Sequence, residues 1–67
     1  MNMETMDATA AGNLRRLLID LARRQETLAN DEAAAAPYWS ATPTSVIAHR
    51  SAAQALRAEA DLLLAIR

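Results

Sequence analysis

The sequence predicts an all-α protein, an antiparallel hairpin of two helices that dimerises into a four-helix bundle. Residues 5–35 and 43–66 favour helix and repeat apolar residues at helical spacing. A Pro-Tyr-Trp break lies between them, in a turn over residues 37–41 that is short enough to make the helices antiparallel neighbours. The 67 residues form one small domain without cysteine, which leaves oligomerisation as the usual means of stabilising so short a chain.

The first helix is amphipathic. Thr5 is the expected N-cap, with Asp7 in the first turn. Pro37 ends the helix, because the residue before a proline avoids the α conformation. Gly12 weakens the helix by about 1 kcal/mol relative to alanine without ending it. The residues expected on the apolar face are Met3, Met6, Ala10, Leu14, Leu17, Leu18, Leu21 and Leu28.

The second helix has a clear start signal, Thr42 as N-cap and Pro43 as the first helical residue, with Thr44 as a rival cap. Nothing interrupts it up to Arg67, which suits the negative end of the helix dipole. Its polar stripe is Arg50, Gln54, Arg57 and Asp61. Its apolar arc is Ala48, Ala52, Ala55, Leu56, Leu62, Leu63 and Ile66.

That arc is wider than the apolar stripe of an ordinary surface helix, so one partner helix leaves part of it uncovered. A second copy of the chain would cover the rest, and so would a different protein. We expect self-association. The residues predicted to mediate it are Leu56, Ala52, Leu63, Ile66 and Leu62.

Tyr38 and Trp39 are the only aromatic residues of the chain. One interpretation is that they fold back and plug the end of the bundle, with their polar tips in water. The other is an exposed anchor, since Trp and Tyr dominate binding hot spots. The sequence favours the plug slightly, and the two roles are compatible.

Three polar residues interrupt the apolar faces. Gln25 lies in the apolar stripe of the first helix, His49 at the edge of the second helix's arc, and Glu59 inside that arc. Buried polar groups need partners, and the hairpin geometry brings Gln25 within a turn of His49. We interpret Gln25 and His49 as residues that set the register of the helices. Glu59 either does the same or faces solvent.

The polar side of the first helix carries a basic edge, Arg16 and Arg23, with Ile19 between them. Such an edge could contact phosphates or an acidic protein. Asp20 lies four residues from Arg16 and offers an ion pair on a solvated helix face instead. Ile19 is either an ordinary exposed apolar residue or an anchor ringed by arginines.

Other classes of protein find no support in the sequence. No catalytic motif, metal spacing or cofactor motif is present, so we expect neither an enzyme nor a bound cofactor. The N-terminus lacks the features of a signal peptide, and no apolar run would span a bilayer, so a cytosolic protein is expected. The net charge of −1 gives no general attraction to nucleic acid.

We therefore predict a small protein–protein interaction module that binds and modulates a larger host protein. The alanine and arginine bias is typical of GC-rich coding, as in actinobacteria or their phages. One alternative is a nucleic-acid-binding hairpin dimer, which resembles the plasmid copy-control protein Rop in layout alone and shares no residue motif with it. Another is a structural subunit of a larger assembly.

Overall fold

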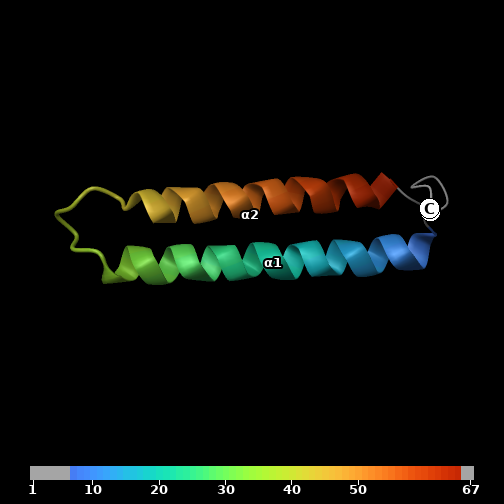
Figure 1. The fold of residues 1–67 in the computed structure, drawn as a ribbon, viewed down its shortest axis with the longest axis horizontal. Coiled ribbons are helices and arrows are strands. Elements are labelled where there is room, and N and C mark those ends of the chain that lie inside the picture. Colours follow the sequence, from blue (N-terminus) through green and yellow to red (C-terminus); the bar gives the residue numbers. More distant parts are fainter. Residues whose placement is uncertain (1–6, 66–67) are drawn as a thin grey trace.

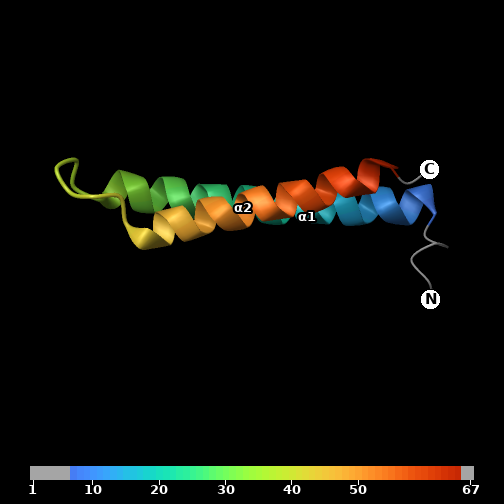
Figure 2. The same cartoon turned by 90° about the horizontal axis from the view of Figure 1, so that it is seen from above.

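The chain is a rod made of two helices. The computed structural model describes residues 7–65, and in that range it contains no strand. Helix α1 spans Ala8–Ala35, α2 spans Thr44–Leu62, and a short 3-10 helix, η2, spans Leu63–Ala65. Figure 1 shows α1 and α2 antiparallel and side by side, and Figure 2 shows them crossing at a shallow angle. The extents are 51 × 18 × 13 Å, and the predicted helical hairpin is confirmed.

The ends of α1 follow local chemistry. Asp7 is the N-cap: its carboxylate accepts a hydrogen bond of 2.7 Å from the backbone N–H of Ala10. The expected cap Thr5 lies outside the described residues. At the other end Ala36 is extended, with ψ at 141°, as Pro37 requires of the residue before it. The prediction that Pro37 ends the helix is confirmed.

Helix α2 starts one residue later than predicted. Pro43, not Thr42, occupies the cap position, and its carbonyl accepts from the N–H groups of Val46 and Ile47. No side chain caps this end, so the prediction of a Thr42 cap is wrong. The α-helix ends at Leu62 and tightens into η2, rather than running on to the C-terminus as an α-helix. Arg67, the expected partner of the helix dipole, is outside the described range.

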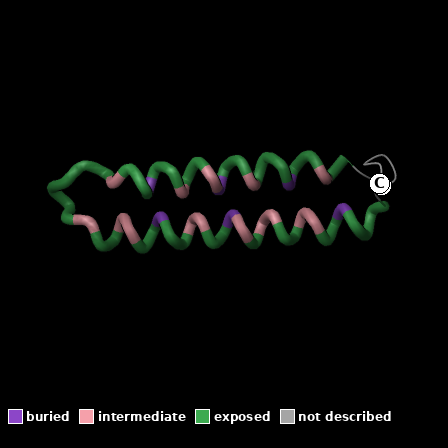
Figure 3. Tube along the Cα trace, viewed as in Figure 1, coloured by how far each residue is buried: buried purple, intermediate pink, exposed green. Residues whose placement is uncertain are grey.

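The two helices meet along a seam of alternating three- and four-residue spacing, the pattern of coiled coils. On α1 the seam residues are Ala11, Arg15, Leu18, Ala22, Gln25, Ala29 and Glu32. On α2 they are Val46, His49, Ala53, Leu56, Ala60 and Leu63. Figure 3 shows the buried positions on the facing sides of the helices.

Small side chains recur at every seventh position of this seam. They are Ala22 and Ala29 on α1 and Val46, Ala53 and Ala60 on α2, and all five are buried. Small residues allow two helix backbones to approach closely, since the distance between helix axes depends on the side chains at the contact. Val46 is the largest fully buried side chain among residues 7–65, so this part of the hairpin has a thin core.

This seam corrects the expected packing. Of the leucines predicted for the apolar face of α1, only Leu18 lies in the seam, and buried alanines occupy three of the other seam positions. The other four leucines lie one position before the seam in sequence, which is about 100° around the helix. As a result Leu17 is 55% exposed and Leu28 is also exposed. Met3 and Met6 lie outside the described residues.

Candidate interaction site

One side of the rod is a leucine face. Its residues on α1 are Leu14, Leu17, Leu21 and Leu28. Its residues on α2 are Ala48, Ala52, Ala55 and Leu62. Every one of them directly precedes a seam position, and in an antiparallel pair such residues share one side of the hairpin. Leu62 is 67% exposed, and a shallow hollow of about 440 Å³ borders Leu28.

The opposite side is a charged face, made of residues that directly follow seam positions. On α1 it comprises Arg16, Ile19, Arg23 and Glu26. On α2 it comprises Arg50, Gln54, Arg57 and Asp61. Four arginines and two carboxylates give this face a net charge of +2. The predicted polar stripe of α2 is exposed, as expected.

An ion pair joins the two helices on the charged face. The Arg57 guanidinium donates to both carboxylate oxygens of Glu26, with Nη2–Oε1 at 2.7 Å and Nε–Oε2 at 3.0 Å. The hydrogen bond from Arg57 lowers the pKa of Glu26, and the hydrogen bond to Glu26 raises the pKa of Arg57. Sequence reasoning missed this pair, which becomes visible only once the seam positions are known.

A polar cluster crosses the seam toward the loop end. The Nδ1 atom of His49 lies 2.6 Å from the Oε1 atom of Gln25, so the predicted contact is present. Its Nε2 atom lies 3.3 Å from a carboxylate oxygen of Glu32, a partner the sequence did not point to. The amide oxygen of Gln25 and the carboxylate oxygen of Glu32 are both acceptors, so each can accept a hydrogen bond from an N–H group of the imidazole ring. The role of these residues in setting the register stays a prediction.

The other predicted residues are spread over several surfaces. Glu59 faces solvent on the leucine face, the second of its two predicted placements. On the charged face Arg16 and Arg23 are exposed, while Ile19 is half-buried. The residues predicted for self-association are divided, because Leu56 and Leu63 lie in the seam whereas Leu62 and Ala52 lie on the leucine face. Ile66 is outside the described residues.

The aromatic residues form the tip of the rod. Ser40 donates backbone and side-chain hydrogen bonds to the Pro37 carbonyl, at 3.1 and 2.8 Å, which closes a turn with Tyr38 and Trp39 at its centre. Tyr38 is 95% exposed and Trp39 is 76% exposed. Their rings form a T-shaped pair with centroids 5.1 Å apart. In the single chain the rings therefore stand away from the end of the hairpin, and their role as a plug at the end of a four-helix bundle stays a prediction.

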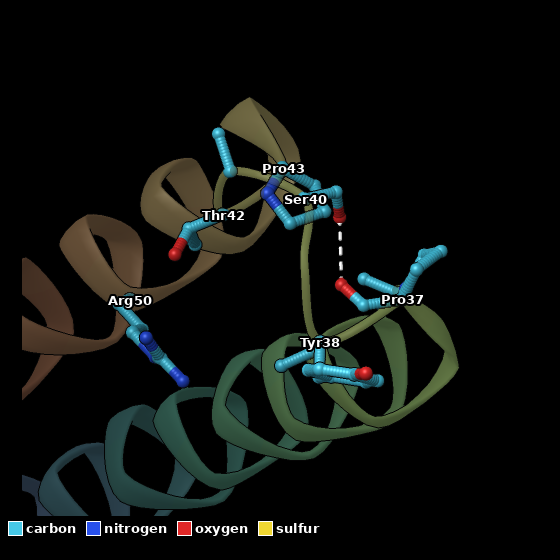
Figure 4. Close-up of a pocket in the computed structure, with 9 residues that line it drawn as sticks. Pro37, Tyr38, Ser40, Thr42, Pro43 and Arg50 are labelled. Carbon is cyan, nitrogen blue, oxygen red and sulfur yellow. Dashed lines mark hydrogen bonds between the residues drawn. The ribbon is translucent and has the colours of Figure 1, made fainter.

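Beside the aromatic pair lies a small hollow of about 210 Å³, the tip pocket. Its lining residues are Ala33, Ala36, Pro37, Tyr38, Ser40, Ala41, Thr42, Pro43 and Arg50. Figure 4 shows Arg50 extending from the start of α2 toward α1 and Tyr38 across the pocket from it. Arg50 was not among the predicted site residues. It looked like one member of a solvated stripe, and only the fold places it beside the loop.

Residues 7–65 contain no group of three or more side chains suited to hold a metal ion. Neither α1 nor α2 is long and apolar enough to cross a membrane.

Comparisons with known proteins leave the family open. No family model matches the chain. No curated protein and no solved structure is similar enough to it to indicate a relative. The function therefore has to be argued from the leucine face, the charged face and the tip.

Proposed function

We propose that this protein is a self-associating helical hairpin that serves as a protein–protein interaction module. In this proposal the leucine faces of two copies pack together into a four-helix bundle. The charged face and the aromatic tip remain available to another protein. The expected cytosolic location and the phage or actinobacterial origin stay predictions.

The observation that carries the proposal is the mismatch between a thin core and a large exposed apolar side. Within residues 7–65 of one chain the buried residues are five alanines and a valine, whereas Leu17, Leu28 and Leu62 stay exposed. Contiguous apolar surface of this kind marks interfaces. Chains of this size also gain stability by oligomerising.

The charges on the leucine face suit contact with a second copy. A two-fold dimer brings the same patch of both subunits together, so the patch must complement itself. Arg24, Asp31 and Glu59 are the charged residues at leucine-face positions, so this side of each copy carries a net charge of only −1. Arg24 of one copy can offset a carboxylate of the other, which keeps the repulsion between two copies small.

Sedimentation equilibrium at tens of micromolar tests this proposal, with the mass of two chains as the expected result. Leu17→Glu should dissociate the dimer because it places a charge in the middle of the interface. Ile47→Glu is the matched control: Ile47 is equally exposed, at 56%, but follows a seam position and lies on the charged side. A wild-type mass of one chain would refute self-association.

Nucleic-acid binding is the second candidate, since the charged face carries exposed Arg16 and Arg23 and a net charge of +2. Arg57 is already bound by Glu26, and the aromatic residues lie at the tip rather than along this face. Unchanged mobility of RNA and DNA at low salt would exclude this candidate. Salt-sensitive binding that Arg16→Ala with Arg23→Ala abolishes would support it.

A further inference from the structure

We propose that the tip pocket binds a carboxylate side chain of an acidic segment in a partner protein. Arg50 would hold the carboxylate, and Tyr38 and Trp39 would contact an apolar side chain next to it. This inference rests on the proposed function as an interaction module and states the chemistry of its partner.

Arg50 is an arginine without a matching carboxylate. Among residues 7–65 no carboxylate forms an ion pair with it, in contrast to Arg57, whose guanidinium fork is filled by Glu26. A guanidinium has five N–H donors in a planar fork that fits a carboxylate in two-point contact. Arg50 is the only charged residue lining the tip pocket, so the pocket favours an anionic ligand.

The surroundings of the pocket add uncharged polar and aromatic contacts. Residues 33–43 include no charged residue, so no acidic group of the loop competes for Arg50. The Thr42 side chain also lines the pocket and carries a hydroxyl that can donate to a carboxylate. Tyr38 lines the pocket, and Trp39 packs edge to face against it outside.

The combination of residue types indicates a protein ligand. Trp, Tyr and Arg are the residues most enriched in protein-binding hot spots, and all three meet at the tip. The pocket volume of about 210 Å³ lies below the roughly 300–1,000 Å³ typical of small-molecule sites. It therefore suits one side chain better than a whole metabolite.

The position of the pocket leaves it free in the proposed dimer. Arg50 belongs to the charged face, opposite the leucine face that the second copy would cover. The same face has an excess of two positive charges, which favours an acidic segment extending along the rod. Self-association and partner binding are therefore compatible.

Pairs of acetylated and amidated pentapeptides test the proposal. The two peptides of a pair differ only at the central residue, which is Glu in one and Gln in the other. The flanking residues vary over all twenty amino acids from pair to pair on an array. The strongest pair is then titrated in solution, where emission from Trp39, the only tryptophan, reports binding at the tip. We expect binding to concentrate among Glu peptides with apolar flanks, and a Kd at least tenfold weaker for the matched Gln peptide.

Variants separate the roles of the residues. Arg50→Gln should weaken the Glu peptide at least tenfold, and Arg50→Lys should restore only part of the affinity because it lacks the fork. Arg16→Gln removes an exposed arginine of the same face that lies about 25 Å along α1 from Ala33, beyond the reach of a pentapeptide at the tip, so it should bind like the wild type. Far-UV circular dichroism of each variant confirms folding, which the exposed position of Arg50 favours.

Three outcomes would overturn the inference: no saturable response of Trp39, equal binding of Glu and Gln peptides, or unchanged binding by Arg50→Gln. A single-stranded oligonucleotide that displaces the peptide and depends on Arg50 would also overturn it and assign the site to phosphate. Sedimentation equilibrium of the same samples measures their mass and so distinguishes a failure of peptide binding from a failure of self-association. Dimers that fail to bind peptide refute this inference alone, whereas single chains refute self-association.

Discussion

The Nδ1 atom of His49 and the Oε1 atom of Gln25 lie 2.6 Å apart across a seam otherwise lined largely by alanine and leucine. Gln25→Ala leaves the ring without this neighbour, and we expect a loss of about 1 kcal/mol of unfolding free energy. Urea unfolding at a fixed protein concentration measures it. Gln54→Ala, at an exposed position, should stay within about 0.5 kcal/mol of the wild type. Equal losses in the two variants would contradict a structural role for the contact.

The seam should tolerate no larger side chain at its small positions. Ala22 is completely buried between the helices, so Ala22→Leu forces the backbones apart. We expect destabilisation of about 1–3 kcal/mol, the usual cost of overpacking a core. Ala58→Leu is the matched control, because Ala58 is exposed on α2 and leucine is a good helix former there. A melting temperature unchanged by Ala22→Leu would argue against the alanine seam.

The ion pair between Glu26 and Arg57 should make stability depend on acid. Because the hydrogen bond from Arg57 lowers the pKa of Glu26 in the folded chain, its contribution is fully present above about pH 4, the pKa range of an unperturbed glutamate. It is lost as the pH falls through the lowered folded value. Arg57 keeps its charge throughout this window, since its pKa is raised.

Thermal unfolding between neutral and acidic pH tests this dependence. The difference in melting temperature between wild type and Glu26→Gln should shrink as Glu26 is protonated, and salt should reduce it at neutral pH. Asp20→Asn removes an exposed carboxylate without an ion pair among the described residues, away from the seam and the leucine face, and serves as control. A difference in melting temperature that stays constant with pH would contradict the link between stability and protonation of Glu26.

The exposed tip should contribute little to folding stability. Trp39 is 76% exposed, and we expect Trp39→Ala to change the unfolding free energy by no more than about 0.5 kcal/mol. Chemical unfolding followed by far-UV circular dichroism measures it without the tryptophan signal. A loss of several kcal/mol would show that Trp39 is buried in the assembled protein, which would support the end-plug interpretation.

Gly12 offers a stabilising substitution. It lies in exposed helix, and a Cβ added there meets nothing within 4 Å. Gly12→Ala should raise the unfolding free energy by about 1 kcal/mol, because alanine loses less backbone entropy in a helix. Ala58→Gly, at an exposed position in α2, should lower it by a similar amount. Destabilisation by Gly12→Ala would indicate that a second copy or a partner packs closely at Gly12.

Local signals of the sequence were sufficient for the hairpin itself. Pro37 ends α1 because of a steric rule that acts between neighbouring residues, and the short connector then leaves the helices antiparallel. The contact between Gln25 and His49 also followed from counting residues back from the turn. The pocket around Arg50 could not be found this way, since its lining comes from both helices and the loop.

By itself, then, the sequence determined two helices, the position of the turn and the presence of more apolar surface than one hairpin covers. The tertiary structure decided which stripe of α1 meets α2. A leucine stripe and an alanine stripe lie about 100° apart on that helix, and both have helical periodicity. Periodicity cannot choose between them, because the choice depends on how closely two backbones approach when small residues of both helices coincide. That close approach leaves Leu17 and Leu28 exposed and sets Arg50 beside an exposed Tyr38.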